Sequence, residues 1–156
     1  MRSVPASALP HDAPVSWRVV YAVEVPLDHL GINVPDVRVA REYYDDLMPL
    51  VGFEPFFAGD DWFSYAPAGG EGTQLFFYAA RDAGGYSRDR AGLQHVCFTV
   101  PSRREVDAAH EWAADRGDEV LHEPRTFPEY HPDHYACFWL DPHGFKLEVV
   151  SFQHTT

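Results

Sequence analysis

The sequence predicts an α+β protein in which two β-α-β-β-β modules pair to form a curved mixed sheet. The first observation is an internal repeat: "LDHLGINVP" at residues 27–35 returns as "LQHVCFTVP" at residues 93–101, which aligns His29 with His95. The second observation is that a helical pattern and then three strand-like runs follow each copy. A single module of this size cannot bury its sheet alone, so the two modules are expected to pack together.

The first module is expected at about residues 26–80, starting with the strand that contains His29. A helix should begin at Asp36, whose side chain is a favourable N-cap, and should end before Gly52. Its apolar face is spaced three and four residues apart and consists of Val37, Ala40, Tyr44, Leu47 and Val51. The strand-like runs that follow are "FEPFFA", "WFSYAP" and "TQLFFYAA".

The second module, at about residues 92–152, repeats this order. Ser102, with Glu105 three residues later, predicts a capping box at the start of its helix, and Gly117 is placed to end that helix. The apolar face of the helix consists of Val106, Ala109 and Ala113. The strand-like runs "DEVLHEP", "YACFWL" and "FKLEVVSF" complete the module, and the turn "DPHG" precedes the last of them.

Length and charge limit the domain organisation and the partners. The 156 residues fit a single domain at 26–152, with a leader at 1–25 and a tail at 153–156. Several prolines predict that the leader is partly flexible, although its "WRVVYAVEV" could add an edge strand. The formal net charge of -12 disfavours nucleic acid and anionic membrane surfaces. Cys97 and Cys137 lie in apolar strand-like runs, which favours a reduced, cytoplasmic protein.

Two histidines and a glutamate are expected on the sheet face that is turned away from the helices. Side chains alternate along a strand, which places His29 and Asn33 on this face. The same alternation places His95, and with it Glu148, on the equivalent face of the second module. Two histidines and one carboxylate form the facial triad of non-haem iron(II) sites. The alternative is that both histidines are structural and that Glu148 pairs with an arginine.

The paired modules, the histidine that opens each of them and "DPHGFKLEV" at residues 141–149 resemble the vicinal oxygen chelate superfamily. This superfamily includes glyoxalase I, methylmalonyl-CoA epimerase, type I extradiol dioxygenases and the fosfomycin and bleomycin resistance proteins. The resemblance implies a cup-shaped sheet with the helices outside, one divalent metal in the cup and a homodimer. It also implies that His29, His95 and Glu148 are the metal ligands. Fe(II) or Mn(II) is expected first, with Zn or Ni as the alternatives.

Two positions depart from the family pattern. Glyoxalase I has a glutamate, and the epimerase a glutamine, as a fourth ligand where this chain has Phe76, although Gln74 on the same face is an alternative. Three ligands resemble the extradiol dioxygenases instead, and His131, "DPHG" and Glu148 fit the spacing of their signature. Phe138 replaces the tyrosine that binds substrate in those enzymes, which argues against ordinary catechol cleavage.

The segment "EYHPDHYACFW" at residues 129–139 supplies the candidates for proton transfer. A neutral histidine beside a metal-bound ligand is a natural general acid or base. We therefore expect a catalytic role first for His131, then for His134, with Tyr135 as a further candidate. The alternative is that this segment is a turn with exposed histidines. Substrate contacts are expected from Asn33, Phe76, Cys97 and Phe138.

These features predict a metal-dependent enzyme that binds a small substrate through two vicinal oxygens, and the many aromatic residues favour an aromatic substrate. Dioxygenase, isomerase and lyase chemistry are the three alternative reaction classes. The alternative function is that of a bleomycin-resistance type protein, which sequesters a drug or metabolite without converting it. The expected partners are a small-molecule substrate and a second copy of the chain, with no nucleic acid and no membrane.

Overall fold

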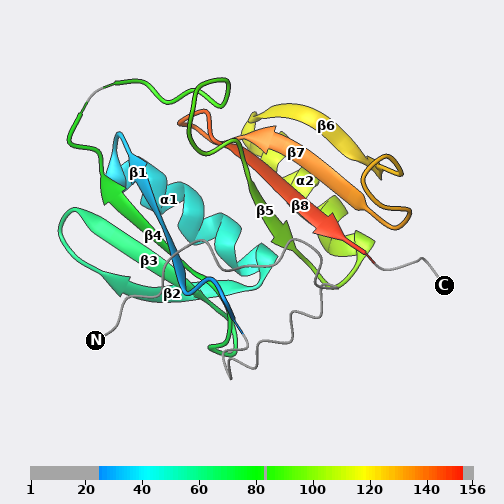
Figure 1. Cartoon of the computed structure of the whole chain (residues 1–156), viewed down its shortest axis with the longest axis horizontal. Coiled ribbons are helices and arrows are strands. Elements are labelled where there is room, and N and C mark those ends of the chain that lie inside the picture. The colour runs from blue at the N-terminus through cyan, green and yellow to red at the C-terminus, as the bar shows by residue number, and fades with distance from the viewer. Residues whose placement is uncertain (1–24, 83, 153–156) are drawn as a thin grey trace, which may run out of the picture.

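The computed structural model describes residues 25–82 and 84–152 and contains both predicted modules (Figure 1). The first module consists of β1 (His29–Val34), α1 (Val37–Leu47), the 3-10 helix η1 (Met48–Val51), β2 (Phe53–Ala58), β3 (Trp62–Pro67) and β4 (Gln74–Ala79). The second consists of β5 (Val96–Thr99), α2 (Arg103–Arg116), β6 (Glu119–Thr126), β7 (Tyr135–Leu140) and β8 (Lys146–Ser151). The order of elements is the predicted one. The leader, with its expected edge strand, and the tail lie outside the described residues, apart from residue 25.

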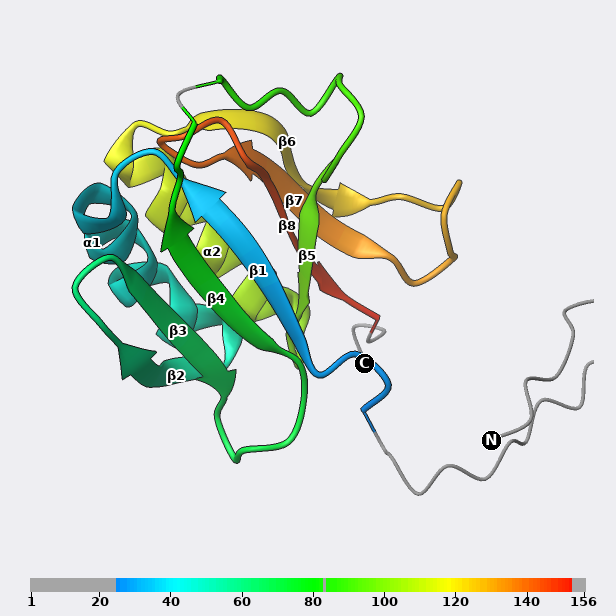
Figure 2. The same cartoon turned by 60° about the vertical axis from the view of Figure 1, so that its left-hand side comes forward.

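Each module forms a four-stranded mixed sheet with the same strand order. The orders are β1-β4-β3-β2 and β5-β8-β7-β6, and the first and last strands of each module pair in parallel. The register places Gln74 beside His29 in one sheet and Glu148 beside Cys97 in the other. In both views α1 and α2 lie on one side of the sheets (Figures 1 and 2). We call the sheet faces turned away from these helices the open faces.

The start of each helix differs in how it is capped. Asp36 accepts a hydrogen bond from the backbone N–H of Val39 at 3.0 Å, as predicted for the start of α1. The capping box predicted for α2 does not form, because the Ser102 hydroxyl donates to the Glu105 carboxylate and caps no backbone N–H. Gly117 ends α2 with a positive φ of 81°, a conformation that glycine adopts at low cost. In the described part of the chain, neither helix has the length and apolar character needed to cross a membrane.

One hydrophobic core joins the two modules and fixes their relative position. It contains the apolar faces of both helices together with side chains from both sheets. Polar contacts cross the same interface: the Tyr44 hydroxyl on α1 donates to Asp141 Oδ2 at 2.7 Å. Trp139 Nε1 on β7 donates to the Tyr43 hydroxyl on α1 at 2.8 Å. The helix of the first module is therefore bonded to the sheet of the second.

Candidate functional site

Glu148 occupies the open face of the second sheet. It lies on β8 between Cys97 on β5 and Phe138 on β7, which are its direct neighbours in the two strand ladders. Only 4% of the residue is exposed. Burying a carboxylate is costly unless hydrogen bonds or a cation compensate for the lost water. The chemistry of the site therefore depends on which groups compensate for the buried Glu148 carboxylate.

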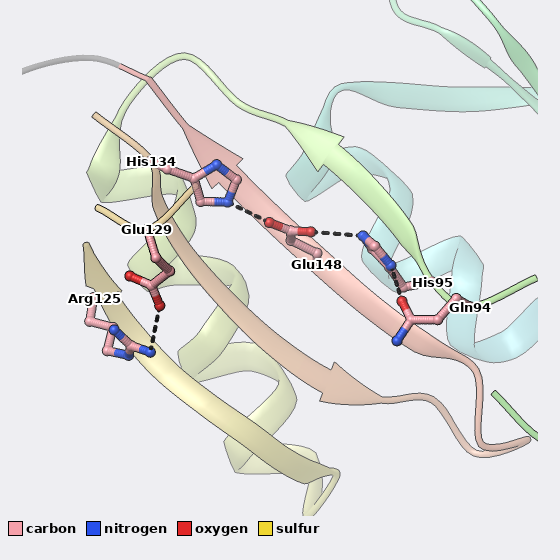
Figure 3. Close-up of polar contacts among 6 residues, drawn as sticks. All are labelled: Gln94, His95, Arg125, Glu129, His134 and Glu148. Atoms are coloured by element: carbon pink, nitrogen blue, oxygen red, sulfur yellow. Dashed lines mark hydrogen bonds and ion pairs between the residues drawn. The ribbon is translucent and has the colours of Figure 1, made fainter. Parts of the chain in front are cut away.

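Two imidazole rings flank the Glu148 carboxylate, one at each oxygen (Figure 3). His95 Nε2 lies 3.1 Å from Oε2, and His134 Nε2 lies 2.7 Å from Oε1. His95 comes just before β5 and His134 just before β7, so the rings approach from opposite sides. The other ring nitrogen of His95 contacts the side-chain oxygen of Gln94. We call Glu148, His95, His134 and Cys97 the Glu148 cluster.

Cys97 belongs to the cluster because it is the direct neighbour of Glu148 in the β5–β8 ladder, on the same face of the sheet. Burial raises the pKa of Cys97 well above its ordinary value, and the negative charge of Glu148 raises it further. The thiol is therefore protonated at neutral pH and is a poor nucleophile.

Aromatic rings surround His134 beyond its contact with Glu148. The ring centroids of Tyr130 and Phe152 both lie 5.4 Å from that of His134, and the centroid of Phe127 lies 6.1 Å away. Tyr130 is 66% exposed and Phe152 is 46% exposed. The imidazole thus sits beside an accessible aromatic surface on which a flat ligand can stack.

The two other predicted catalytic residues lie elsewhere, although they are close to His134 in sequence. His131 is exposed in the loop before β7, and its Nδ1 accepts a hydrogen bond from a backbone N–H of the same loop at 3.2 Å. The Tyr135 hydroxyl donates to Asp107 Oδ1 on α2 at 2.8 Å and so faces the helix. Of the three candidates, the structure brings His134 to Glu148.

The open face of the first sheet carries a cluster of aromatic rings next to His29. Trp62, Phe76 and Tyr78 form this cluster, in which each ring is near the other two: the centroid of Phe76 lies 6.1 Å from that of Trp62 and 6.1 Å from that of Tyr78, and the last two are 6.4 Å apart. The His29 ring meets the Phe76 ring at 5.5 Å, and its Nδ1 lies 2.7 Å from Asp28 Oδ2. The His29 side chain is 57% exposed. It is accessible, but it belongs to a different sheet from the Glu148 cluster.

The structure therefore divides the predicted site residues into separate groups. Within residues 25–82 and 84–152, no three His, Cys, Asp or Glu side chains are placed so that they could hold one metal ion. His95 and Glu148 adjoin each other, whereas His29 stands beside Gln74 on the other sheet. The predicted substrate residues divide in the same way: Cys97 and Phe138 flank Glu148, Phe76 contacts His29, and Asn33 lines a cavity of about 730 Å³.

A family comparison agrees with this two-module architecture. The sequence profile of the glyoxalase/bleomycin resistance protein/dioxygenase superfamily matches residues 26–149. The chain belongs to this superfamily. Among curated proteins, YqjT of Bacillus subtilis (strain 168) is 26% identical over 128 residues, which cover 80% of this chain and 98% of YqjT.

Solved structures of the glyoxalase superfamily have the same fold. A candidate glyoxalase from Bacillus halodurans is 30% identical with a TM-score of 0.68, over 81% of this chain and 95% of that chain. A glyoxalase/dioxygenase from Nostoc punctiforme has a TM-score of 0.66 at 16% identity, over 95% of this chain and all (100%) of that chain. Residues 26–149 thus form a glyoxalase-type fold, which confirms the predicted resemblance.

Alternation indicates which side chains of β7 share a face with Phe138, but it does not place His134. Phe138 pairs with Glu148 across β7 and β8, and alternation puts Ala136 on the same face. His134 precedes β7, and its approach to Glu148 depends on the loop before that strand. Nothing in the sequence indicated which aromatic rings would surround His134. Phe127 follows β6 and Phe152 follows β8, and both rings lie near His134 only because β6, β7 and β8 are paired.

Proposed function

We propose that the protein is a metal-dependent enzyme that acts on a small, flat substrate carrying two vicinal oxygens. The observation that carries this proposal is the buried Glu148 carboxylate, whose polar neighbours are two imidazoles and a thiol. Over the described residues it forms no ion pair with an arginine or a lysine. A divalent cation would supply the missing counter-charge.

The donor types near Glu148 suit a first-row transition metal. Two histidines and one carboxylate fit Fe(II) or Mn(II), with Zn or Ni as alternatives. In this proposal His95 and Glu148 hold the ion and His29 is the third ligand. When bound, the metal supplies Lewis acidity that favours the anionic form of the chelated substrate oxygens.

His134 supplies proton transfer in this proposal. Its Nε2 lies 2.7 Å from Glu148 Oε1, and its side chain is 13% exposed. The carboxylate fixes the orientation of the ring, as in the carboxylate–histidine pairs of other sites. Because Nε2 is engaged, Nδ1 is the atom that exchanges a proton with substrate. The aromatic surfaces on the two open faces would orient a flat substrate and exclude water from it.

His29 reaches the Glu148 cluster, in our proposal, from a second copy of the chain. In the described chain it lies on the other sheet and is more than half exposed. A homodimer in which each copy lends His29 to the His95–Glu148 pair of its partner would give three ligands at each of two sites. The exposed aromatic side chains Tyr78 and Tyr130, which lie near His29 and His134, would be covered in such a dimer.

Metal content tests this proposal. Protein purified without added metal should carry a near-stoichiometric divalent ion by inductively coupled plasma mass spectrometry. His29→Ala, His95→Ala and Glu148→Gln should each remove most of it, because two ligands hold a divalent ion poorly. His110→Ala, a matched change on α2, should leave it unchanged. His134→Ala should keep the metal but lose turnover. A trace metal content that a chelator removes without affecting ligand binding would refute the enzyme proposal.

Sequestration of a drug or metabolite is the second candidate function. The observation that favours it is the amount of accessible aromatic surface, with Tyr78, Tyr130 and Phe152 each at least 40% exposed. In this case tight binding of a flat ligand should survive both chelation and His134→Ala. Calorimetric titration of the chelated protein separates the two functions, since only the enzyme should lose affinity for a substrate with vicinal oxygens.

A further inference from the structure

A cavity of about 730 Å³ lies outside the Glu148 cluster, between β1 and the linker that joins the two modules. The linker consists of residues 80–82 and 84–93 in the described chain, and it arches over one end of the sheets (Figures 1 and 2). None of the four residues of the Glu148 cluster lines the cavity. Its volume lies within the range of small-molecule sites, roughly 300–1,000 Å³. The cavity is therefore a separate candidate site with room for an organic ligand.

The linker wall of the cavity is held in place by specific contacts. The Tyr86 hydroxyl donates to the backbone carbonyl of Leu93 at 2.7 Å, and the Tyr86 ring packs on Phe145 at a centroid distance of 4.2 Å. The backbone N–H of Arg90 donates to the carbonyl of Ser87 at 3.1 Å, which closes a turn. These contacts brace the part of the linker from Tyr86 to Leu93, which would reduce the conformational entropy lost on binding.

The floor of the cavity is apolar. It includes Leu30 and Ile32 of β1, and Phe145, which begins the last strand run of the second module. Both modules therefore contribute to it. An apolar floor favours the hydrocarbon or aromatic body of a ligand, because burying such a surface removes it from water.

Two arginines are among the residues that line the cavity. Arg81 and Arg90 both line it, and neither forms an ion pair with any residue that the structure describes. Asp82 also lines the cavity, but its Oδ1 is engaged by the backbone N–H of Gly84 at 3.0 Å. Two guanidinium groups and one carboxylate give the cavity lining a net positive charge, in a chain whose formal net charge is -12. Guanidinium groups bind carboxylate, sulfonate and phosphate oxygens through paired hydrogen bonds.

We infer that this cavity binds a small organic anion, which has an apolar or aromatic body on the floor and an acidic group between Arg81 and Arg90. Asn33 on the open face of β1 supplies a further polar contact. The inference does not depend on the metal, because none of the proposed ligands takes part in it.

Anilinonaphthalene sulfonate, a fluorescent aromatic anion, is the probe that tests this inference. Titrated into the full chain after chelation, it should bind with a saturable rise in fluorescence. Benzoate and phenyl phosphate should displace it and neutral benzyl alcohol should not, and the stronger competitor identifies a carboxylate or a phosphate ligand. Arg81→Gln combined with Arg90→Gln should weaken probe binding by about tenfold or more, because two charge-assisted hydrogen bonds are lost.

A matched double variant separates a local site from general electrostatics. Arg38→Gln with Arg104→Gln removes the same charge from α1 and α2, and it should change probe affinity by less than about twofold, since screened surface charges contribute little. Equal weakening in both double variants would overturn the inference. So would a loss of probe binding in Glu148→Gln but not in the Arg81 and Arg90 variant, because the probe would then occupy the Glu148 cluster. Circular dichroism and melting temperatures should show that all variants fold.

Discussion

Among single residues, Glu148 controls the chemistry of its neighbour Cys97. Burial is the largest cause of the raised pKa of the Cys97 thiol, and the Glu148 charge adds to it. Glu148→Gln removes the charge but keeps the shape, so it should lower this pKa and increase the fraction of reactive thiolate. With both proteins chelated, we expect iodoacetamide to alkylate Cys97 severalfold faster in Glu148→Gln, with the rate rising at a lower pH than in the parent.

The second cysteine must be removed for this measurement. The parent and the Glu148→Gln variant should both carry Cys137→Ser, because Cys137 is a second free cysteine that iodoacetamide could label. Burial raises the pKa of Cys137 to about 12. Adding Cys97→Ser should abolish labelling. If the alkylation rate of Cys97 has the same pH profile with and without the Glu148 carboxylate, burial alone suppresses the reactivity of the thiol.

Residue positions on a face could be predicted from the sequence, whereas side-chain partners could not. Alternation along β1 correctly put His29 and Asn33 on the exposed face and Ile32 on the buried one. The preference for His131 over His134 came from the spacing of a family signature. Which of the two histidines meets Glu148 depends on how the loop before β7 closes, and that closure is set by backbone bonds such as the one from His134 N–H to the His131 carbonyl.

Helix capping gives a prediction at the level of elements. The Asp36 carboxylate satisfies the Val39 N–H at the start of α1, whereas the Ser102 hydroxyl satisfies no backbone donor of α2. Asp36→Ala should therefore lower the melting temperature by several degrees, and Ser102→Ala should lower it less. The backbone hydrogen bond from Val39 holds the pKa of Asp36 below its usual value, so this stabilisation should be lost as the pH falls through that lowered pKa.

Asp36→Asn is the matched control, because the amide oxygen can still accept the Val39 N–H while the charge is lost. It should keep most of the stability of the parent at neutral pH and lose the acid dependence. Equal effects of Asp36→Ala and Ser102→Ala in differential scanning calorimetry would contradict the difference in capping.

The helices and strands themselves were predictable because their signals are local. The spacing of Ala40, Tyr44 and Leu47 marks the buried face of α1, and all three are buried. The prediction of a capping box for α2 was wrong because the side chains of Ser102 and Glu105 hydrogen-bond to each other, which competes with capping of the backbone. A motif of residue types does not decide between such competing partners.

Across the whole molecule, the bond from Tyr44 to Asp141 links the two modules. Burial raises the pKa of Asp141, and the Tyr44 hydroxyl lowers it by stabilising the carboxylate. Tyr44→Phe should raise this pKa further, which penalises the ionised, folded state. The loss in free energy of unfolding should be about 1–3 kcal/mol near pH 7. It should shrink as the pH falls and Asp141 becomes protonated, because a carboxyl with a raised folded-state pKa favours folding in acid.

Urea denaturation at several pH values measures this effect. Tyr130→Phe removes a hydroxyl from a residue that is 66% exposed and should leave the stability unchanged at every pH. If Tyr44→Phe lowers the free energy of unfolding by the same amount at every pH, Tyr44 and Asp141 are not coupled through the charge of Asp141. Neither Tyr44 nor Asp141 could be paired from the sequence, because they belong to different modules and meet only when α1 packs on the second sheet.

A homodimer with shared sites makes the last prediction. If each copy lends His29 to its partner, His29→Ala and Glu148→Gln chains are each inactive alone but complement each other when mixed. A mixed dimer has one site with His29, His95 and Glu148 all intact, and another site with both changes. Random pairing should therefore restore metal binding to about a quarter of the sites. Co-refolding the two variants and measuring bound metal after gel filtration provides the test. No restoration, with dimers present, would mean that the three ligands meet within one chain. A purely monomeric 17.7 kDa species in sedimentation would refute the dimer itself.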